Sequence, residues 1–291
     1  MTACFLSALL VAWFGTPPSD HSTSAEASVQ SFGARGDGVA DDSDALQAAF
    51  DSGPSVLPRP SAYYRITRTL RVSSSVRGVG MPELRMVGAD GSPAKTLLAV
   101  IGYAGPMPLT VTGLHLNGGW DGVGTAGEWS HTISILGSRN VVIEGNELDS
   151  PYGDNVYLGK LPVPPHTNSA RITIRRNAAR SPRRCNIAVV AAQEVVIEDN
   201  YLEKTNGYVA AIDLEPNNDP RDRVSSVLII NNKVFAPKSP FVYAYTTSGY
   251  PFSIRGVTVD GNSGKARAAY AVGKPQTRVE LQVVRNNHIT P

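Results

Sequence analysis

The sequence has too few cysteines for a fold held together by disulfide bonds. Its two cysteines are Cys4, in the apolar N-terminal stretch, and Cys185, so we expect no disulfide in the mature chain. Aromatic residues make up 7% of the chain, charged residues 18%, and the net charge is only +2. The sequence contains no run of lysine and arginine and no aromatic-plus-basic motif, so we expect no nucleic-acid partner.

Long apolar runs are also missing, except at the start of the chain. Residues 1–15 are mostly apolar but too few to span a membrane comfortably. Ala25 and Ala27 flank Glu26 in a small-x-small pattern typical of secretory cleavage sites, although no basic residue precedes the apolar run. We predict that residues 1–27 are a signal peptide and spacer. The protein would then be secreted or on the cell surface, with no stable membrane span after cleavage.

Turn-forming residues are plentiful. The chain has 27 glycines and 21 prolines, and 42% of its residues are hydrophobic. This composition is typical of a β-rich protein with many turns and a sizeable core. We expect residues 28–291 to form a single domain.

A repeat of the form apolar-x-apolar-x-x-Asn dominates this domain. Copies recur at intervals of 23 to 32 residues and end at Asn146, Asn177, Asn200, Asn232, Asn262 and Asn286, with a degenerate copy ending at Asn117. A second short strand follows each copy after a polar turn. No hairpin signal joins the two strands, so the chain is expected to wind in one direction and stack each strand on its equivalent one turn later. The predicted fold is an all-β, right-handed parallel β-helix with a column of structural asparagines.

The segment 28–54 is expected to cap the open N-terminal end of this solenoid. Within it, "DDSDALQAAFDSG" has Asp and Ser at a helix start, apolar residues at helical spacing, and Gly53 as a stop signal. A short amphipathic helix here would cover the core and strand edges of the first coil.

Three motifs in this region resemble a known group of proteins. "FGARGDGVADDSDALQAAFDSG" (32–53), "VLPRPSAYYRITRTLRV" (56–72) and "VRGVG" (76–80) resemble the N-terminal segment of the pectate-lyase-like superfamily, particularly its rhamnogalacturonase/epimerase-type branch. The resemblance implies a right-handed parallel β-helix that acts on polysaccharide. It supplies no catalytic residue, because the Gly/Gln-Asp-Asp, His-Gly and Arg-Ile-Lys set of the polygalacturonase-type hydrolases and the Asp-Pro-His pattern of the mannuronan epimerases are absent from the sequence.

Two acids on one short strand are the leading catalytic candidates. Asp213 and Glu215 alternate with apolar residues and so share a face of the strand, about 6.5–7 Å apart along the chain. Carboxyl groups about 6.5–9.5 Å apart suit inverting glycoside hydrolysis. The structural alternative is that Glu215 caps the next turn and Asp213 binds a loop. Asp154, two coils away, is the third candidate acid.

Alignment of the second strands predicts the neighbours of this pair. Two outward columns result: Ser134, Tyr157, Ala188, Asp213 and Tyr243 in one, and Leu136, Gly159, Val190, Glu215 and Tyr245 in the other. The small residues would leave a depression on one side of the acids. The tyrosines would border the other side.

A second chemistry would use a different set of residues. Tyr152, Tyr157 or Lys160 could act as the base for β-elimination from a uronic acid, and Arg183 and Arg184 could neutralise its carboxylate. The alternative for the two arginines is a solvated turn.

A loop before the strand that begins at His131 contains two tryptophans, Trp120 and Trp129. Aromatic faces stack on sugar rings, so Trp129 and His131 could form a sugar subsite, although packing of the loop onto the coil explains them equally well. The sequence has no zinc-binding pattern. We expect no cofactor, although a Ca²⁺ site remains compatible with the acids present.

Three functions follow from these features. A secreted glycoside hydrolase acting on a polysaccharide is favoured, a polysaccharide lyase or uronate epimerase is the alternative, and a non-catalytic carbohydrate-binding β-helix is the third. A monomer is favoured and a trimer is possible, because the sequence after Asn287 contains no evident trimerisation segment.

Overall fold

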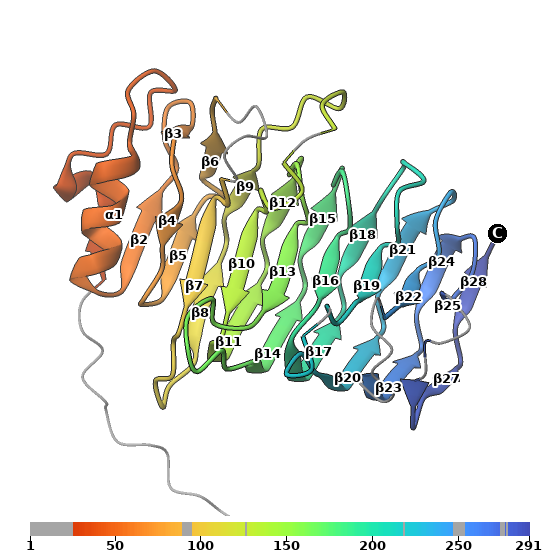
Figure 1. Ribbon diagram of the computed structural model, residues 1–291. Helices are drawn as coiled ribbons and strands as arrows, with labels where there is room; N and C mark the ends of the chain where they lie inside the picture. The colour runs from red at the N-terminus through yellow and green to blue at the C-terminus, as the bar shows by residue number, and fades with distance from the viewer. Residues whose placement is uncertain are drawn as a thin grey trace, which may run out of the picture.

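The structure is a computed structural model that describes residues 26–88, 95–125, 127–217, 219–246, 254–273, 277 and 279–291. The predicted signal peptide lies outside these residues except for Glu26 and Ala27. The chain winds through three stacked parallel sheets, which confirms the predicted parallel β-helix (Figure 1). None of the described helices is long and apolar enough to cross a membrane.

Each full coil contributes one strand to each sheet, in the order first, second, third. The first sheet has eleven strands: β1 (Ala27–Ser28), β2 (Ser55–Pro58), β5 (Val76–Val79), β8 (Leu109–Thr112), β11 (Arg139–Glu144), β14 (Ser169–Arg175), β17 (Ala192–Glu198), β20 (Val224–Ile230), β23 (Ile254–Asp260), β26 (Val279–Glu280) and β27 (Val283–Arg285). The second sheet has nine: β3 (Tyr64–Ile66), β6 (Glu83–Met86), β9 (His115–Asn117), β12 (Glu147–Asp149), β15 (Ala178–Arg180), β18 (Tyr201–Glu203), β21 (Lys233–Ala236), β24 (Ser263–Ala266) and β28 (His288–Thr290). The third sheet has eight: β4 (Leu70–Arg71), β7 (Leu98–Ile101), β10 (Ile133–Leu136), β13 (Val156–Gly159), β16 (Ile187–Val189), β19 (Ile212–Leu214), β22 (Val242–Ala244) and β25 (Tyr270–Val272).

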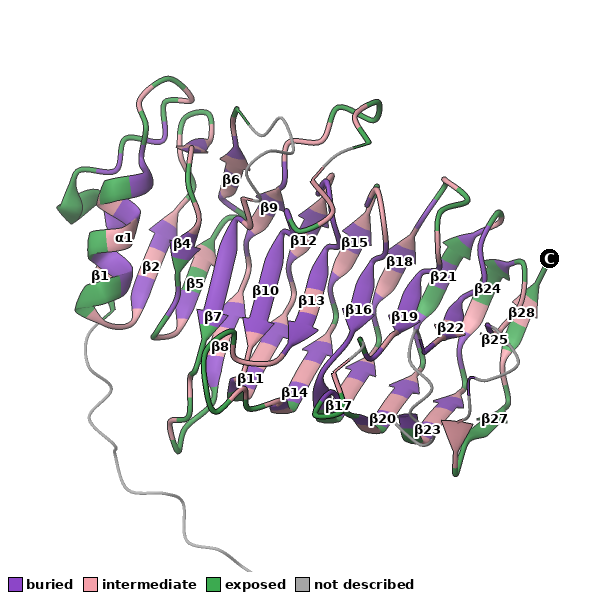
Figure 2. Ribbon diagram, viewed as in Figure 1, coloured by how far each residue is buried: buried purple, intermediate pink, exposed green. Residues whose placement is uncertain are grey.

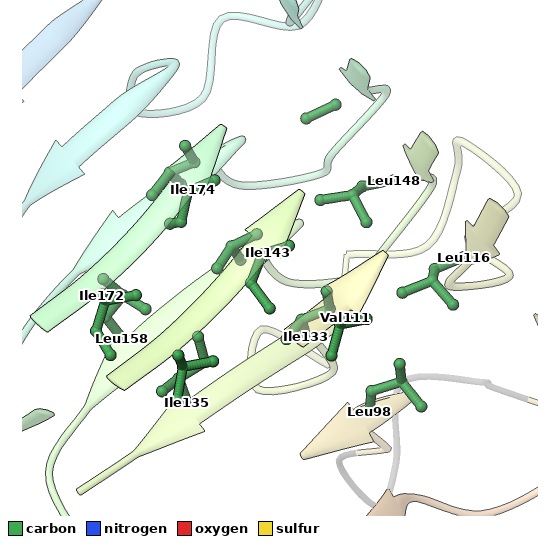
Figure 3. Close-up of a cluster of buried hydrophobic side chains, with 14 of the residues drawn as sticks. Leu98, Val111, Leu116, Ile133, Ile135, Ile143, Leu148, Leu158, Ile172 and Ile174 are labelled. Atoms are coloured by element: carbon green, nitrogen blue, oxygen red, sulfur yellow. The ribbon is translucent and has the colours of Figure 1, made fainter. Parts of the chain in front are cut away.

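The core consists of columns of aliphatic side chains that run along the axis of the coil. In the first sheet, Val141 and Ile143 of β11 stack in register on Ile172 and Ile174 of β14. Figure 3 shows Ile143, Ile172 and Ile174 in this core. All four are buried. Burial of each such side chain contributes about 1.5–3 kcal/mol, so the repeated apolar pair stabilises every coil in the same way.

The asparagine column lies at the turn between the first and second sheets. The side-chain oxygen of Asn200 accepts hydrogen bonds from the backbone N–H of Asn177 (3.0 Å) and from its side-chain amide (3.1 Å). The amide of Asn200 donates to the carbonyl of Ile174 and to the side-chain oxygen of Asn232. The asparagines therefore satisfy buried turn groups from coil to coil, which confirms their structural role.

The last member of the column differs from the predicted one by one residue. Asn262 donates to the side chain of Asn287, whereas Asn286 adopts a positive φ of 52° and bonds Asp260. The residue before each ladder position has a positive φ, and in an Asn-Asn pair the first asparagine takes that conformation. Asn117 also lies outside the column, because it pairs with Asp149 one coil later. The column position in its coil is occupied by Leu114, whose backbone N–H donates to the side chain of Asn146.

A short helix covers the N-terminal end of the coil, as predicted. Helix α1 (Ser43–Ser52) follows the 3₁₀ turn η1 (Val29–Phe32) and lies against β2 and β4 at the first coil (Figure 1). Its buried apolar face consists of Leu46, Ala49 and Phe50.

The third sheet differs from the other two in the burial of its outer face. In the first and second sheets, buried residues alternate with more exposed ones, as in β14 and β15. In β16 and β19 of the third sheet, all three residues are buried (Figure 2). Side chains and loops therefore cover the outer face of these two strands, where the candidate acids lie.

The asparagine column provides a test of the fold. Asn200→Ala removes the side-chain partner of the buried N–H of Asn177 and of the carbonyl of Ile174, so we expect the free energy of unfolding to fall by about 1–3 kcal/mol in urea denaturation. Asn286→Gly, at an exposed position whose positive φ suits glycine, is the matched control and should change stability little. Equal losses for the two variants would contradict the role of the column.

Candidate active site

The candidate acids lie in register with the residues expected beside them. Asp213 of β19 pairs with Ala188 of β16 and with Tyr243 of β22. The backbone N–H of Glu215 donates to the carbonyl of Val189, and that of Tyr245 to the carbonyl of Leu214. Glu215 therefore lies beside Tyr245, and the two outward columns are those that the repeat predicts.

A cavity of about 580 Å³ opens over these columns. Its lining includes Asp213, Glu215, Arg184, Trp129, Tyr243 and Tyr245. Residues from at least three coils and from the loop before β10 thus meet in one place. The rings of Tyr243 and Tyr245 stack with 6.1 Å between their centroids and an interplanar angle of 11°, which gives the cavity an aromatic wall.

Asp213 is buried without a hydrogen-bond donor. It is 1% exposed, and neither of its carboxylate oxygens has a partner among the described residues. Burial raises the pKa of Asp213 well above its usual range, and the nearby carboxylates of Glu215 and Asp154 raise it further. Asp213 therefore keeps its proton to a higher pH than an exposed aspartate does.

Arg184 carries the positive charge at the centre of the site. Its guanidinium lies 3.6 Å from Glu215 Oε2, 3.6 Å from Asp154 Oδ1 and 3.2 Å from Glu128 Oε2. Although burial lowers the pKa of Arg184, these carboxylates leave it above its usual value. Arg184 thus stays charged and offsets the charge of Glu215.

Asp154 lies beneath the site and lines neither of the cavities described on this face. Its Oδ1 accepts a hydrogen bond from the backbone N–H of Cys185 (2.9 Å), and its Oδ2 lies 3.2 Å from Nδ1 of His131. Its backbone N–H donates to the same nitrogen of His131 (3.1 Å). Asp154 is placed to hold Arg184 and His131, rather than to touch a substrate.

The residues considered for β-elimination are held in other contacts. Lys160 Nζ lies 2.6 Å from Asp219 Oδ2 and 2.7 Å from Asp222 Oδ1. Although burial lowers its pKa, these hydrogen bonds leave the pKa of Lys160 above its usual value. Burial raises the pKa of Tyr157. Each change makes deprotonation harder, and a base for elimination must lose its proton.

Arg183 and Tyr152 line neither of the two cavities described on this face. Nε of Arg183 donates to the carbonyl of Tyr152 (2.6 Å), and its guanidinium lies 5.7 Å from the ring centroid of Tyr208. Tyr152 is 6% exposed and lines neither cavity. Of the adjacent arginines, only Arg184 is directed into the site.

Lys204 is a site residue that sequence reasoning missed. It is fully buried and donates to the carbonyl of Arg184 and to Asn206 (2.6 Å). Asn206 in turn donates to the carbonyls of Pro182 and Arg183. The two side chains hold the turn that carries Arg184. Burial lowers the pKa of Lys204 to about 8. The backbone N–H of Lys204 donates to the carbonyl of Phe235, which aligns Lys204 with the buried Ala236 of the next coil. Only this alignment indicates that the side chain of Lys204 is buried.

A second cavity, of about 430 Å³, continues the first toward the N-terminal coils. The two share Trp129, Tyr157, Val190 and Asn217 in their linings, so they form one groove across the third sheet. The ring of His131 stacks on that of Tyr157, at 4.5 Å between centroids, and Trp129 meets Tyr157 edge-on at 6.0 Å. The side chains of the predicted sugar subsite thus lie together where the cavities meet.

Among the described residues, no three His, Cys, Asp or Glu side chains are grouped as metal ligands. The expectation of no cofactor remains a prediction.

Comparison with known proteins gives distant relatives. No family model matches the chain. The uncharacterized protein YclG of Bacillus subtilis (strain 168) is 27% identical over 175 residues, which cover 56% of this chain and 29% of that protein. The SPbeta prophage-derived uncharacterized protein YorA of the same organism is 29% identical over 85 residues, 28% of this chain and 14% of that protein. The matched regions span less than a third of either relative.

Solved structures similar to this one are parallel β-helix proteins. An exopolygalacturonase from Thermotoga maritima has a TM-score of 0.65 and 13% identity, covering 92% of this chain and 82% of that one. The adhesin PfbA of Streptococcus pneumoniae has a TM-score of 0.56 and 15% identity, covering 91% and 86%. A tailspike of Escherichia coli bacteriophage HK620, in complex with a hexasaccharide, has a TM-score of 0.50 and 12% identity, covering 91% and 57%. The fold is therefore the right-handed parallel β-helix.

The raised pKa of Asp213 predicts how stability depends on pH. As pH rises above 3.8, the usual pKa of an aspartate, the unfolded chain releases this proton while the folded protein retains it, so stability falls. The fall is at most about 1.4 kcal/mol per pH unit and continues until the folded carboxyl ionises. Asp213→Asn removes this contribution, so we expect the variant to be more stable than the wild type at pH 7 in urea denaturation.

The control for this prediction is Asp44→Asn. The Asp44 side chain is 95% exposed, and its surface ion pair with Arg68 contributes little to stability. A loss of stability at pH 7 in Asp213→Asn, with an unchanged pH dependence, would contradict the buried, protonated carboxyl.

Proposed function

We propose that this protein, a right-handed parallel β-helix of the pectate-lyase-like superfamily, is a glycoside hydrolase that binds a polysaccharide along the groove of its third sheet. Its structural relatives support a polysaccharide as substrate: one is an exopolygalacturonase and another a tailspike in complex with a hexasaccharide. The reaction is proposed from the site itself, because sequence identities of 12–15% indicate a shared fold and not a shared reaction.

The observation that carries the proposal is the difference between the environments of two adjacent acids. Asp213 is buried without a donor, and its pKa is raised. Glu215 lies 3.6 Å from the guanidinium of Arg184, which stabilises a negative charge there. A protonated acid beside a carboxylate is the combination that glycoside hydrolysis requires.

The two acids then have separate roles. Asp213 donates its proton to the glycosidic oxygen as the bond to the leaving sugar breaks. Glu215 takes a proton from the attacking water, or attacks the anomeric carbon itself. Arg184 compensates the charge on Glu215, while Asp154 and Lys204 hold Arg184 in position. The anomeric form of the first product, measured by NMR, distinguishes these two roles of Glu215, because direct attack retains the configuration and attack by water inverts it.

The aromatic residues along the groove provide surfaces for sugar rings. Trp129 is 50% exposed and lies where the two cavities meet, and the stacked pair Tyr243 and Tyr245 lies on the far side of the acids. Sugar rings on these faces would place a glycosidic bond over Asp213. An extracellular location suits a polysaccharide substrate, and we propose it together with the predicted signal peptide.

Product chemistry distinguishes the proposed hydrolase from a lyase. We expect cleavage of a susceptible polysaccharide to release reducing ends without an unsaturated uronate that absorbs in the near ultraviolet. Lys160 and Tyr157 are poor bases in this structure, which is why elimination is not expected. Ultraviolet-absorbing products would support the lyase. Saturable binding of intact polysaccharide without any cleavage would support the non-catalytic binding protein.

Substitution of the acid pair tests the assignment of roles. Asp213→Asn and Glu215→Gln should each lower kcat by about 10²–10⁴-fold, because each removes a group that transfers a proton in the reaction. Glu147→Gln, at an outer-face position of β12 in the second sheet, is the control and should retain wild-type kcat. If the two site variants also retain it, the catalytic pair is assigned wrongly.

A further inference from the structure

The second cavity has a chemistry different from that of the acid pair, and it lies over β7, β10 and the residues that follow β16. In register, Ala99 pairs with Ser134 and Ile101 with Leu136, so the cavity continues the same two outward columns. Its apolar lining includes Ala99, Ile101, Leu136, Pro162, Val190 and Ala191. A ligand here would have to bury an apolar group.

The charged residues of this cavity already neutralise each other. Lys160 is bound by both Asp219 and Asp222, and Asp222 itself lines the cavity. Arg221 also pairs with Asp219 at 2.6 Å, so two cations balance the two carboxylates. A uronate, sulfate or phosphate group would therefore find no unpaired cation among the described lining residues, and an uncharged group is favoured.

One buried hydrogen-bond donor in the lining has no partner. His131 is 3% exposed, and its Nδ1 accepts the backbone N–H of Asp154 at 3.1 Å. A ring nitrogen that accepts a hydrogen bond carries no proton, so with this contact the proton lies on Nε2. Because Nδ1 accepts this bond, and Asp154 Oδ2 at 3.2 Å from it makes no hydrogen bond, Nε2 is the donor of the ring. It has no hydrogen-bond partner among the described residues, and an unpaired buried donor is unfavourable.

The ring of His131 is fixed as well as unpaired. It stacks on Tyr157 at an interplanar angle of 12°, and Trp129 meets it edge-on at 6.4 Å. Asp154 holds its other nitrogen. The donor therefore has a set position beside an apolar surface, which is the arrangement that selects a ligand by shape and by one hydrogen bond.

We infer that this cavity binds the acetyl group of an acetylated sugar next to the sugar whose bond is cleaved. The acetyl carbonyl accepts from Nε2 of His131, and the methyl group packs against Ala99, Ile101 and Leu136. A deoxy-sugar methyl group would fill the apolar space but leave Nε2 unpaired. A hydroxyl group would pair with Nε2 but leave its own hydrogen against an apolar wall. The inference rests on the proposed function for the position of the neighbouring sugar.

The acetyl group can be attached through nitrogen or oxygen, and the experiment separates the two. Saturation-transfer NMR is performed on the full chain with three probes: methyl N-acetylglucosaminide, methyl 6-O-acetylglucoside and unacetylated methyl glucoside. We expect the acetyl methyl protons of one or both acetylated probes to receive the strongest saturation, and the unacetylated probe to receive little. Preference for one acetylated probe identifies the linkage.

Variants connect the signal to the cavity. Ala99→Leu fills the space for the methyl group and should abolish its saturation. Ala178→Leu makes the same change on the outer face of β15 in the second sheet and should leave the signal unchanged. His131→Phe retains a ring to stack on Tyr157 but removes the donor, and should raise Kd for the acetylated probe roughly threefold to tenfold.

The results also separate this inference from the proposed hydrolase. Equal saturation of acetylated and unacetylated probes, or a signal that survives Ala99→Leu, would overturn the acetyl subsite even if the protein cleaves polysaccharide. Selective methyl saturation in a protein that cleaves no polysaccharide would support the subsite and overturn the hydrolase.

Discussion

The fold and the site both depend on one constraint, which is that every coil stacks on the next in the same register. A parallel ladder places residue above residue, so a side chain that recurs in the sequence becomes a column in space. The asparagine column uses this to satisfy buried turn groups, as in the hydrogen bond from Asn177 to Asn200. The same register brings Tyr157, Ala188 and Asp213 side by side, although they come from three different coils.

The site is built from groups that are unfavourable for folding. A buried carboxyl at Asp213 and a buried ammonium at Lys204 are each expensive to remove from water. The pKa shifts reflect this: the acid retains its proton and the amine releases its proton more readily, since both respond to burial by favouring the neutral form. The stacked core, repeated in each coil, contributes the favourable free energy that offsets the unfavourable burial of these two groups. Such an exchange of stability for activity is common where function requires strained or desolvated groups.

The sequence predicts those features that repeat, because periodicity is a local signal. The parallel β-helix, the capping helix near Leu46 and the two outward columns could all be predicted before the structure was known. Asn286 was misplaced by one residue because two asparagines occur in succession and only backbone conformation distinguishes them. The features that could not be predicted depend on loops of irregular length. The partners of Lys160, which are Asp219 and Asp222, lie about sixty residues away in the chain, and no repeat positions them.

The distribution of unsatisfied polar atoms explains why function is assigned to the third sheet. On the first sheet, Arg175 lies 2.8 Å from Glu144 and 3.9 Å from Glu198, so its outer face has ion pairs that run from coil to coil. Among the described residues, the buried side-chain atoms without a partner belong to His131, Thr132, Asp154, Arg184, Asn186, Asp213 and Tyr270. All of these residues lie in strands of the third sheet or in the turns that lead into them. Native proteins satisfy nearly all buried polar groups, so seven such residues along one sheet would be costly without a role. A polysaccharide along that sheet is a ligand whose hydroxyl and carbonyl groups could pair with those of them that line the groove, such as Asp213 and His131.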